Sequence, residues 1–208
     1  MRKWVILIGY IIILTIGLIN KDWILSWIQT SERSSLPIML FLSTLIAAIP
    51  IIPFTIFAGL MGAKFGVMAG LLINWFGGVS ASVLYFFLAR YFFKGFFSNY
   101  LNRVKGVVRF QNMVERNAFI AILLGRMIMI IPPPVINIYS GVTNIPFTVF
   151  FAGTVIGNLP PMFLIAYSGE QIFSSLRNLS LGVILYAIFI LFILLIYKVW
   201  FVPKPKME

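Results

Sequence analysis

Gly125-Arg126-Met127-Ile128-Met129-Ile130-Ile131-Pro132-Pro133-Pro134 is the stretch of the sequence that decides how the chain folds. It combines one arginine and three consecutive prolines with apolar residues on both sides. A proline run removes backbone donors and prevents a regular helix. Irregular backbone at membrane depth is tolerated only where protein buries it or water reaches it. The stretch therefore predicts the tip of a re-entrant helical hairpin and the working site of the protein.

The composition around this stretch is that of an all-α integral membrane protein that crosses the membrane several times. Of the 208 residues, 61% are hydrophobic and only 10% are charged, whereas soluble domains carry about 25% charged residues. The chain has no Cys and no His, and its five acidic residues are scattered. These absences argue against thiol, imidazole and metal chemistry. We therefore expect no metal, no cofactor and no enzymatic activity.

Three regions are predicted. Residues 1–35 are expected to form an N-terminal transmembrane anchor, with an uncleaved span at Trp4–Ile19 after the basic Met1-Arg2-Lys3. The same region continues into an interfacial helix over 21–35, for which an ordinary loop is the alternative. Residues 36–169 form the central membrane domain, and residues 170–208 form a last transmembrane helix with a basic tail.

The central domain reads as two broken segments, each followed by an unbroken span. The first broken segment, 36–62, contains Pro50, Pro53 and Gly59, and the second, 118–141, contains Pro132, Pro133, Pro134 and Gly141; we assign all seven residues as hairpin breaks. The spans that follow are 66–93, which contains Asn74, and 146–168, which contains Asn158. A final apolar span runs over 181–200.

The charge pattern selects the topology. The loop at 94–117 carries most of the basic residues that lie between apolar segments. If every segment crossed the membrane, this loop would lie outside, against the positive-inside rule. If both broken segments are re-entrant, every basic cluster lies on the cytoplasmic side. We therefore predict four transmembrane helices plus two inverted re-entrant helical hairpins, with both termini inside a bacterial cytoplasmic membrane. Loop 94–117 is expected to bind the anionic cytoplasmic leaflet, and not nucleic acid.

The two hairpins also share a spacing. Pro50, Gly59 and Phe65 recur as Pro132, Gly141 and Phe147, each displaced by 82 positions. Copies on opposite faces of a membrane form an inverted repeat, which is a common transporter construction.

One family shares these motifs. The chain resembles the DedA / SNARE-associated Golgi protein (VTT domain) superfamily, with its Tvp-type branch the nearer match, over roughly residues 36–169. The residues that carry the resemblance are Pro53, Gly59, Phe65-Gly66, Gly70, Gly125-Arg126, Pro132-Pro133-Pro134, Asn137, Gly141, Phe147, Gly157, Pro160 and Gly169.

The resemblance implies paired re-entrant hairpins and movement of lipids between leaflets. The implied activity is phospholipid scrambling in eukaryotic relatives and translocation of polyprenyl-phosphate in some bacterial ones. Several bacterial relatives carry acids in the first hairpin and two arginines in the second. Here Arg126 matches the first arginine, Pro132 stands near the second, and the first hairpin has no acid. This departure weakens both proton coupling and a polyprenyl-phosphate cargo.

Arg126 and Asn137 are the predicted headgroup-binding residues. A guanidinium matches phosphate bidentately and stays charged; the alternative is that Arg126 only binds carbonyls freed by the prolines. Further polar residues are candidates for lining the path: Asn74, Asn158, Arg90 and Glu170. For the asparagines the alternative is helix–helix packing, for Arg90 snorkelling to the interface, and for Glu170 a plain loop charge.

Two other functions stay open at this point. One is transport of a small solute or ion through the same hairpins, and the other is a non-transporting membrane assembly factor. The pattern leaves the identity of the lipid and the oligomeric state open.

Overall fold

The chain is helical throughout the regular parts that the structure describes. The computed structural model describes residues 35–49, 53–92, 117–129, 131–171 and 175–201, together with residues 15, 19, 20, 26, 30 and 114. No strand occurs among them. The predicted first span, the interfacial helix, Pro50 and the basic loop 94–117 lie outside the described residues, apart from single positions. The predicted region boundaries stay predictions.

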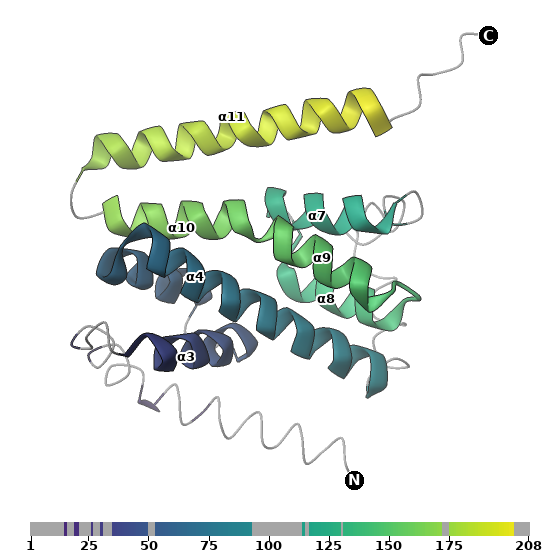
Figure 1. Ribbon diagram of the computed structural model, residues 1–208, viewed down its shortest axis with the longest axis horizontal. Coiled ribbons are helices and arrows are strands. Elements are labelled where there is room, and N and C mark those ends of the chain that lie inside the picture. Colours follow the sequence, from purple (N-terminus) through teal and green to yellow (C-terminus); the bar gives the residue numbers. More distant parts are fainter. Residues whose placement is uncertain are drawn as a thin grey trace.

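Hairpin 1 consists of α3 (Leu36–Ala48) and the first arm of α4 (Phe54–Tyr91) (Figure 1). α4 begins directly after Pro53, whose fixed φ suits the start of a helix. α4 is broken at Gly66, where φ is 82° and ψ is 171°. Only glycine adopts that backbone conformation without strain. The break separates the short arm 54–65 from a long segment, 67–91.

Hairpin 2 consists of α7 (Ala118–Ile128) and α8 (Pro133–Val142). The Asn117 side chain caps α7 by accepting a hydrogen bond of 3.1 Å from the Ile120 backbone N–H. α7 ends where Met129 takes a left-handed conformation with φ 56°, and α8 starts with Pro133 in its first turn. The prediction that the proline run interrupts the helix is confirmed.

Two of the predicted hairpin breaks are wrong. Gly59 lies inside the first arm of α4, and Gly141 lies inside α8. The reversals fall instead at Gly66 and over 143–146. Gly141 sits against α4 where a side chain would collide, whereas Gly59 itself has room for a Cβ and its backbone is what Gly169 of α10 packs against.

The long helix of the second half is formed by α9 (Phe147–Gly157) and α10 (Leu159–Gln171). They meet at Asn158, close to Pro160 and Pro161, which lack the N–H groups that would continue the hydrogen-bond ladder. Three helical stretches are long and apolar enough to cross a membrane: Phe54–Tyr91, Phe147–Gln171 and Arg177–Leu195. The chain is thus an all-helical membrane protein in the part described.

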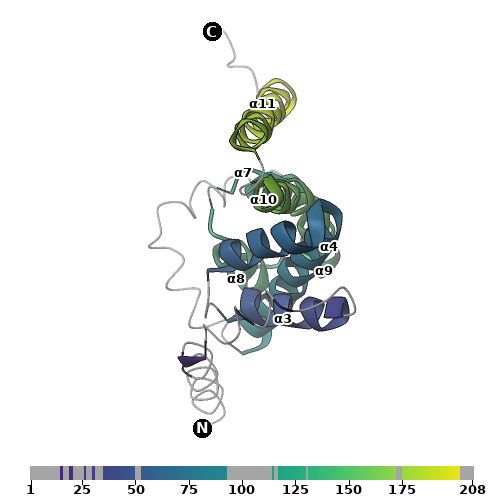
Figure 2. The same cartoon turned by 90° about the vertical axis from the view of Figure 1, so that its left-hand side faces the viewer.

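α11 (Leu176–Phe201) lies along one side of the bundle and contacts it mainly through α10 (Figure 2). Gly182 of α11 packs on the Tyr167 ring, which a Cβ at position 182 would approach to 2.5 Å. The outward face of α11 is apolar and exposed, as expected for a helix that contacts lipid.

The short arm of each half packs on the long helix of the other half. The first arm of α4 packs on α10, where a Cβ at Gly62 or Gly169 would collide with the backbone of Ala166 or Gly59. α8 packs on the long segment of α4, where a Cβ at Gly141 would lie 2.5 Å from the Phe86 carbonyl oxygen. Each hairpin is therefore held by the long helix of the other half, and small residues allow the close approach.

Candidate functional site

Arg126 lies where three helices of the second half meet. It belongs to the last turn of α7 and is 3% exposed. Its Nη2 donates to Asn137 Oδ1 on α8 and, at 3.4 Å, to Thr154 Oγ1 on α9. Both acceptors are buried. The structure thus brings together the two predicted headgroup residues and adds a third, Thr154.

A glycine on the neighbouring helix makes room for this arginine. A Cβ at Gly157 of α9 would lie 2.7 Å from the Arg126 Cβ and 3.0 Å from the Leu123 carbonyl oxygen. Two turns earlier on the same helix, the Phe150 ring has its centroid 5.9 Å from the Arg126 Cζ, a cation–π distance. Close approach of α7 and α9 therefore buries the whole side chain.

The charge of Arg126 has no ionic partner in the described part of the chain. Both of its hydrogen-bond acceptors are neutral, and its buried Nε has no hydrogen-bond partner. Glu170 is the single carboxylate among the described residues. It follows Gly157 by 13 residues, which is roughly 20 Å along a helix. An uncompensated buried charge costs several kcal/mol, and an anion placed beside Arg126 would offset that cost.

The start of α8 contributes little to this site through its backbone. A helix N-terminus usually presents backbone N–H donors to an anion. Pro133 and Pro134 occupy the first positions and have no N–H, and the Val135 N–H donates to the Pro132 carbonyl oxygen at 2.9 Å. The three prolines are exposed at the hairpin tip. Anion binding here therefore depends on side chains and not on a cradle of backbone amides.

The two predicted path-lining asparagines do not hydrogen-bond to Arg126. The Asn74 Nδ2 donates to the Ala58 carbonyl oxygen at 2.9 Å, which ties the long segment of α4 to its own short arm. Asn158 lies beside Gly78, with its Nδ2 3.6 Å from where a Cβ would stand. Both residues join helices, which is the alternative that the sequence left open.

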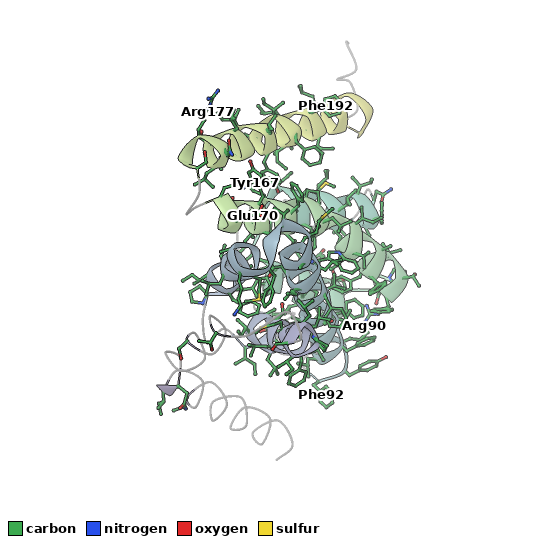
Figure 3. The ribbon with its side chains drawn as sticks, turned by 60° about the vertical axis from the view of Figure 1, so that its left-hand side comes forward. Arg90, Phe92, Tyr167, Glu170, Arg177 and Phe192 are labelled. Carbon is green, nitrogen blue, oxygen red and sulfur yellow. The ribbon has the colours of Figure 1, made fainter. Side chains whose placement is uncertain are left out.

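Arg90 and Glu170 lie at the ends of two different long helices, far apart in the bundle (Figure 3). The Arg90 guanidinium does not snorkel into water, since it donates to four backbone carbonyls around the end of α8. Glu170 faces the break in α4, where a Cβ at Gly66 would lie 3.3 Å from its Oε1. Neither residue contributes to the group around Arg126.

Two residues that the sequence did not single out now belong to the site. A threonine in an apolar helix usually satisfies its hydroxyl on its own backbone, so Thr154 carried no signal beyond its spacing of three from Gly157. Tyr186 of α11 donates its hydroxyl to the Met127 carbonyl oxygen, next to Arg126. Metal ligands are not gathered there, since the described residues contain no group of three His, Cys, Asp or Glu.

Comparison with known proteins assigns the family. The profile of the VTT domain matches residues 49–171. The chain belongs to the VTT-domain (DedA) family. This VTT-domain protein is 33% identical to YqeD of Bacillus subtilis (strain 168), across 95% of this chain and 94% of the relative. It is 24% identical to the membrane protein YhjE of the same organism, across 84% of this chain and 81% of the relative. No solved structure matches the chain.

The family match confirms the resemblance inferred from the motifs. The matched range includes Arg126, Asn137 and Thr154 together with both hairpins, except for α3, which ends one residue before it. The Tvp-type branch stays a prediction.

Proposed function

We propose that this VTT-domain protein moves anionic lipids between the two leaflets of a bacterial cytoplasmic membrane. The observation that carries the proposal is the buried Arg126. Among the described residues, its hydrogen-bond acceptors are the neutral side chains of Asn137 and Thr154. Ionisable groups at membrane depth are costly and mark substrate or ion paths. A lipid phosphate supplies the missing negative charge.

The geometry of the hairpins supports a re-entrant arrangement. α3 has 13 residues and α7 has 11. Helices of that length reach roughly 16 to 20 Å, well short of the ~30 Å hydrocarbon core. Each is followed by a reversal and by a short arm that leads into a long apolar helix. We propose that both hairpins dip into the membrane from opposite faces and that both chain termini are cytoplasmic, as the basic loops favour.

The chemistry of Arg126 suits a phosphate oxygen. Its hydrogen bonds to Asn137 and Thr154 both leave from Nη2, and Nε is unpaired. A guanidinium presents parallel N–H groups to two oxygens of one phosphate, which a lysine ammonium cannot do. In the proposed cycle the headgroup binds these donors, and Asn137 and Thr154 hold the guanidinium plane in place.

The proposed movement is downhill. No acid occurs in hairpin 1, and Glu170, the described carboxylate, lies far from Arg126 along α10. We therefore expect lipids to equilibrate between leaflets without a proton gradient. Loop 94–117, with its excess of basic residues, is proposed to lie on anionic lipids of the cytoplasmic leaflet.

The test is a liposome assay. The purified protein is reconstituted into vesicles of phosphatidylglycerol and phosphatidylcholine that contain a fluorescent phosphatidylglycerol, and the outer label is reduced chemically. With the wild type, we expect label from both leaflets to become accessible to the reductant. Arg126→Ala should slow this exchange at least about 10-fold, because one pair of charge-assisted hydrogen bonds to the phosphate is lost. Arg126→Lys is expected to restore only a minor part.

The matched control is Arg177→Ala, because Arg177 is an exposed arginine of α11. Its exchange rate should equal that of the wild type. Exchange that is undiminished in Arg126→Ala would remove the arginine from the mechanism. Solute uptake or electrical current without lipid exchange would favour a solute or ion transporter, and inert vesicles would favour an assembly factor.

A further inference from the structure

Arg90 makes an unusual set of hydrogen bonds for a residue at the end of a membrane helix. Its Nε donates to the Gly141 carbonyl oxygen at 3.1 Å. Its Nη2 donates to the carbonyl oxygens of Ser140, Thr143 and Ile145 at 3.2, 2.9 and 2.7 Å. All four acceptors come from hairpin 2 and the turn that follows it, 50 to 55 residues further along the chain.

These acceptors form the negatively polarised end of a helix. α8 ends at Val142, and the last carbonyls of a helix have no partner within it. They also carry the negative end of the helix dipole, which favours a cation. Arg90 thus supplies hydrogen bonds that a further turn of α8 would have made to these carbonyls. It also binds the turn that leads into α9, so one side chain fixes both ends of that connection.

The guanidinium of Arg90 also lies over an aromatic ring. The Arg90 Cζ lies 4.3 Å from the centroid of the Phe86 ring, one turn earlier on α4. The Phe86 carbonyl oxygen is where a Cβ at Gly141 would collide, at 2.5 Å. Phe86 therefore supports the guanidinium and seats α8 at the same place, which leaves α8 little freedom to slide along α4.

The position of α8 decides where Asn137 stands. Asn137 and Ser140 are three residues apart on α8 and both are buried, so they share one face of the helix. The Ser140 carbonyl oxygen accepts a hydrogen bond from Arg90, and the Asn137 side-chain oxygen accepts one from Arg126. A displacement of the α8 end by one hydrogen-bond length would draw the Asn137 oxygen away from Arg126.

We propose that Arg90 is a positioning residue for the Arg126 site. It binds no lipid, and it acts by fixing α8 so that Asn137 holds the guanidinium of Arg126 in place. Its effect on transport rests on the function proposed above, whereas its effect on the position of α8 does not. A planar fork reaches carbonyls in several directions, so lysine or glutamine replaces only part of the set.

The position of α8 is measured first, by electron spin resonance distances between two introduced cysteines. The chain has no native cysteine, so Asn144→Cys and Leu72→Cys give a clean label pair. Both side chains are exposed, Asn144 in the turn after α8 and Leu72 on α4. In nanodiscs we expect a narrow distance distribution for the wild type, a broadened one for Arg90→Gln and an intermediate one for Arg90→Lys. Arg177→Gln is the matched control and should leave the distribution unchanged.

Lipid exchange then separates positioning from general damage. Arg90→Gln is expected to slow exchange about 10-fold in the otherwise native protein. In an Asn137→Ala background the same change should slow it less than 2-fold further, because the amide through which Arg90 acts is gone. Losses that multiply in full would contradict the proposed route.

An unchanged distance distribution in Arg90→Gln would overturn the proposal, whatever the exchange rates are. If the wild-type protein moves no lipid, the proposed function fails, and the spin-label distances still decide the role of Arg90.

Discussion

The two hairpins have the same architecture and opposite polar chemistry. In each, a short helix approaches the following long helix at a glycine: Ser43 of α3 stands against Gly77, and Arg126 of α7 stands against Gly157. The Ser43 hydroxyl donates to the Ile73 carbonyl oxygen at 2.9 Å and is fully satisfied. Arg126 keeps an unpaired Nε and an uncompensated charge. The same scaffold therefore holds a hydrogen-bonded serine in hairpin 1 and a buried, uncompensated charge in hairpin 2, where we propose that an anion binds.

The two hairpin tips are capped by tyrosines from different helices. The last carbonyl of α3, at Ala48, accepts a hydrogen bond of 2.8 Å from Tyr85 Oη on the long segment of α4. The Met127 carbonyl near the end of α7 accepts one from Tyr186 Oη on α11. Hairpin 1 is thus closed from within its own half, whereas hairpin 2 uses a helix outside the repeat.

The largest effect is expected where the two halves exchange arms. Gly169→Ala should lower the free energy of unfolding by about 3 kcal/mol, because the new Cβ would collide with the Gly59 backbone. Gly59→Ala at the same contact finds nothing within 4 Å and should leave stability equal or slightly raised, since alanine is the better helix former. Thermal unfolding in detergent compares the two, and equal losses would mean that the arms are not packed as described.

A second comparison separates charge from packing. Arg126→Met should slow lipid exchange about 10-fold or more. It should leave the melting temperature unchanged or raised, because an apolar side chain removes an unpaired buried charge. Ser43→Ala at the matching place in hairpin 1 should leave exchange near the wild-type rate. A loss of exchange in Ser43→Ala as deep as in Arg126→Met would remove the functional distinction between the hairpins.

The smallest effect is expected at the two capping tyrosines. Tyr85→Phe should cost about 1 kcal/mol of stability, the net value of one hydrogen bond. Tyr186→Phe should cost less, about 0.5 kcal/mol, since α11, which carries Tyr186, contacts the bundle mainly through α10 and holds this hydrogen bond less firmly. Chemical unfolding of both variants in one detergent ranks them, and the reverse order would show that α11 supports hairpin 2 more than its packing indicates.

For hairpin 2, the sequence predicted which residues stand out, but it did not predict what surrounds them. The Pro132–Pro134 run predicted the reversal, and the intramembrane Arg126 was singled out by its charge. Gly59 and Gly141 both lie inside short helical arms, so their predicted role as breaks is wrong. A glycine at a tight helix contact and a glycine at a helix break look the same in a sequence, and only the packing of the neighbouring helix distinguishes them.

The sequence by itself determined the all-helical membrane class, the family and the place of the buried arginine, because hydropathy, proline and charge act locally along the chain. Only the tertiary structure decided what each polar group faces. It joined Thr154 to Arg126 across 28 residues and carried Arg90 to the end of α8 across about 50. Such partners depend on which helices pack together, and an exchange of arms between two halves leaves no trace in the spacing of either half.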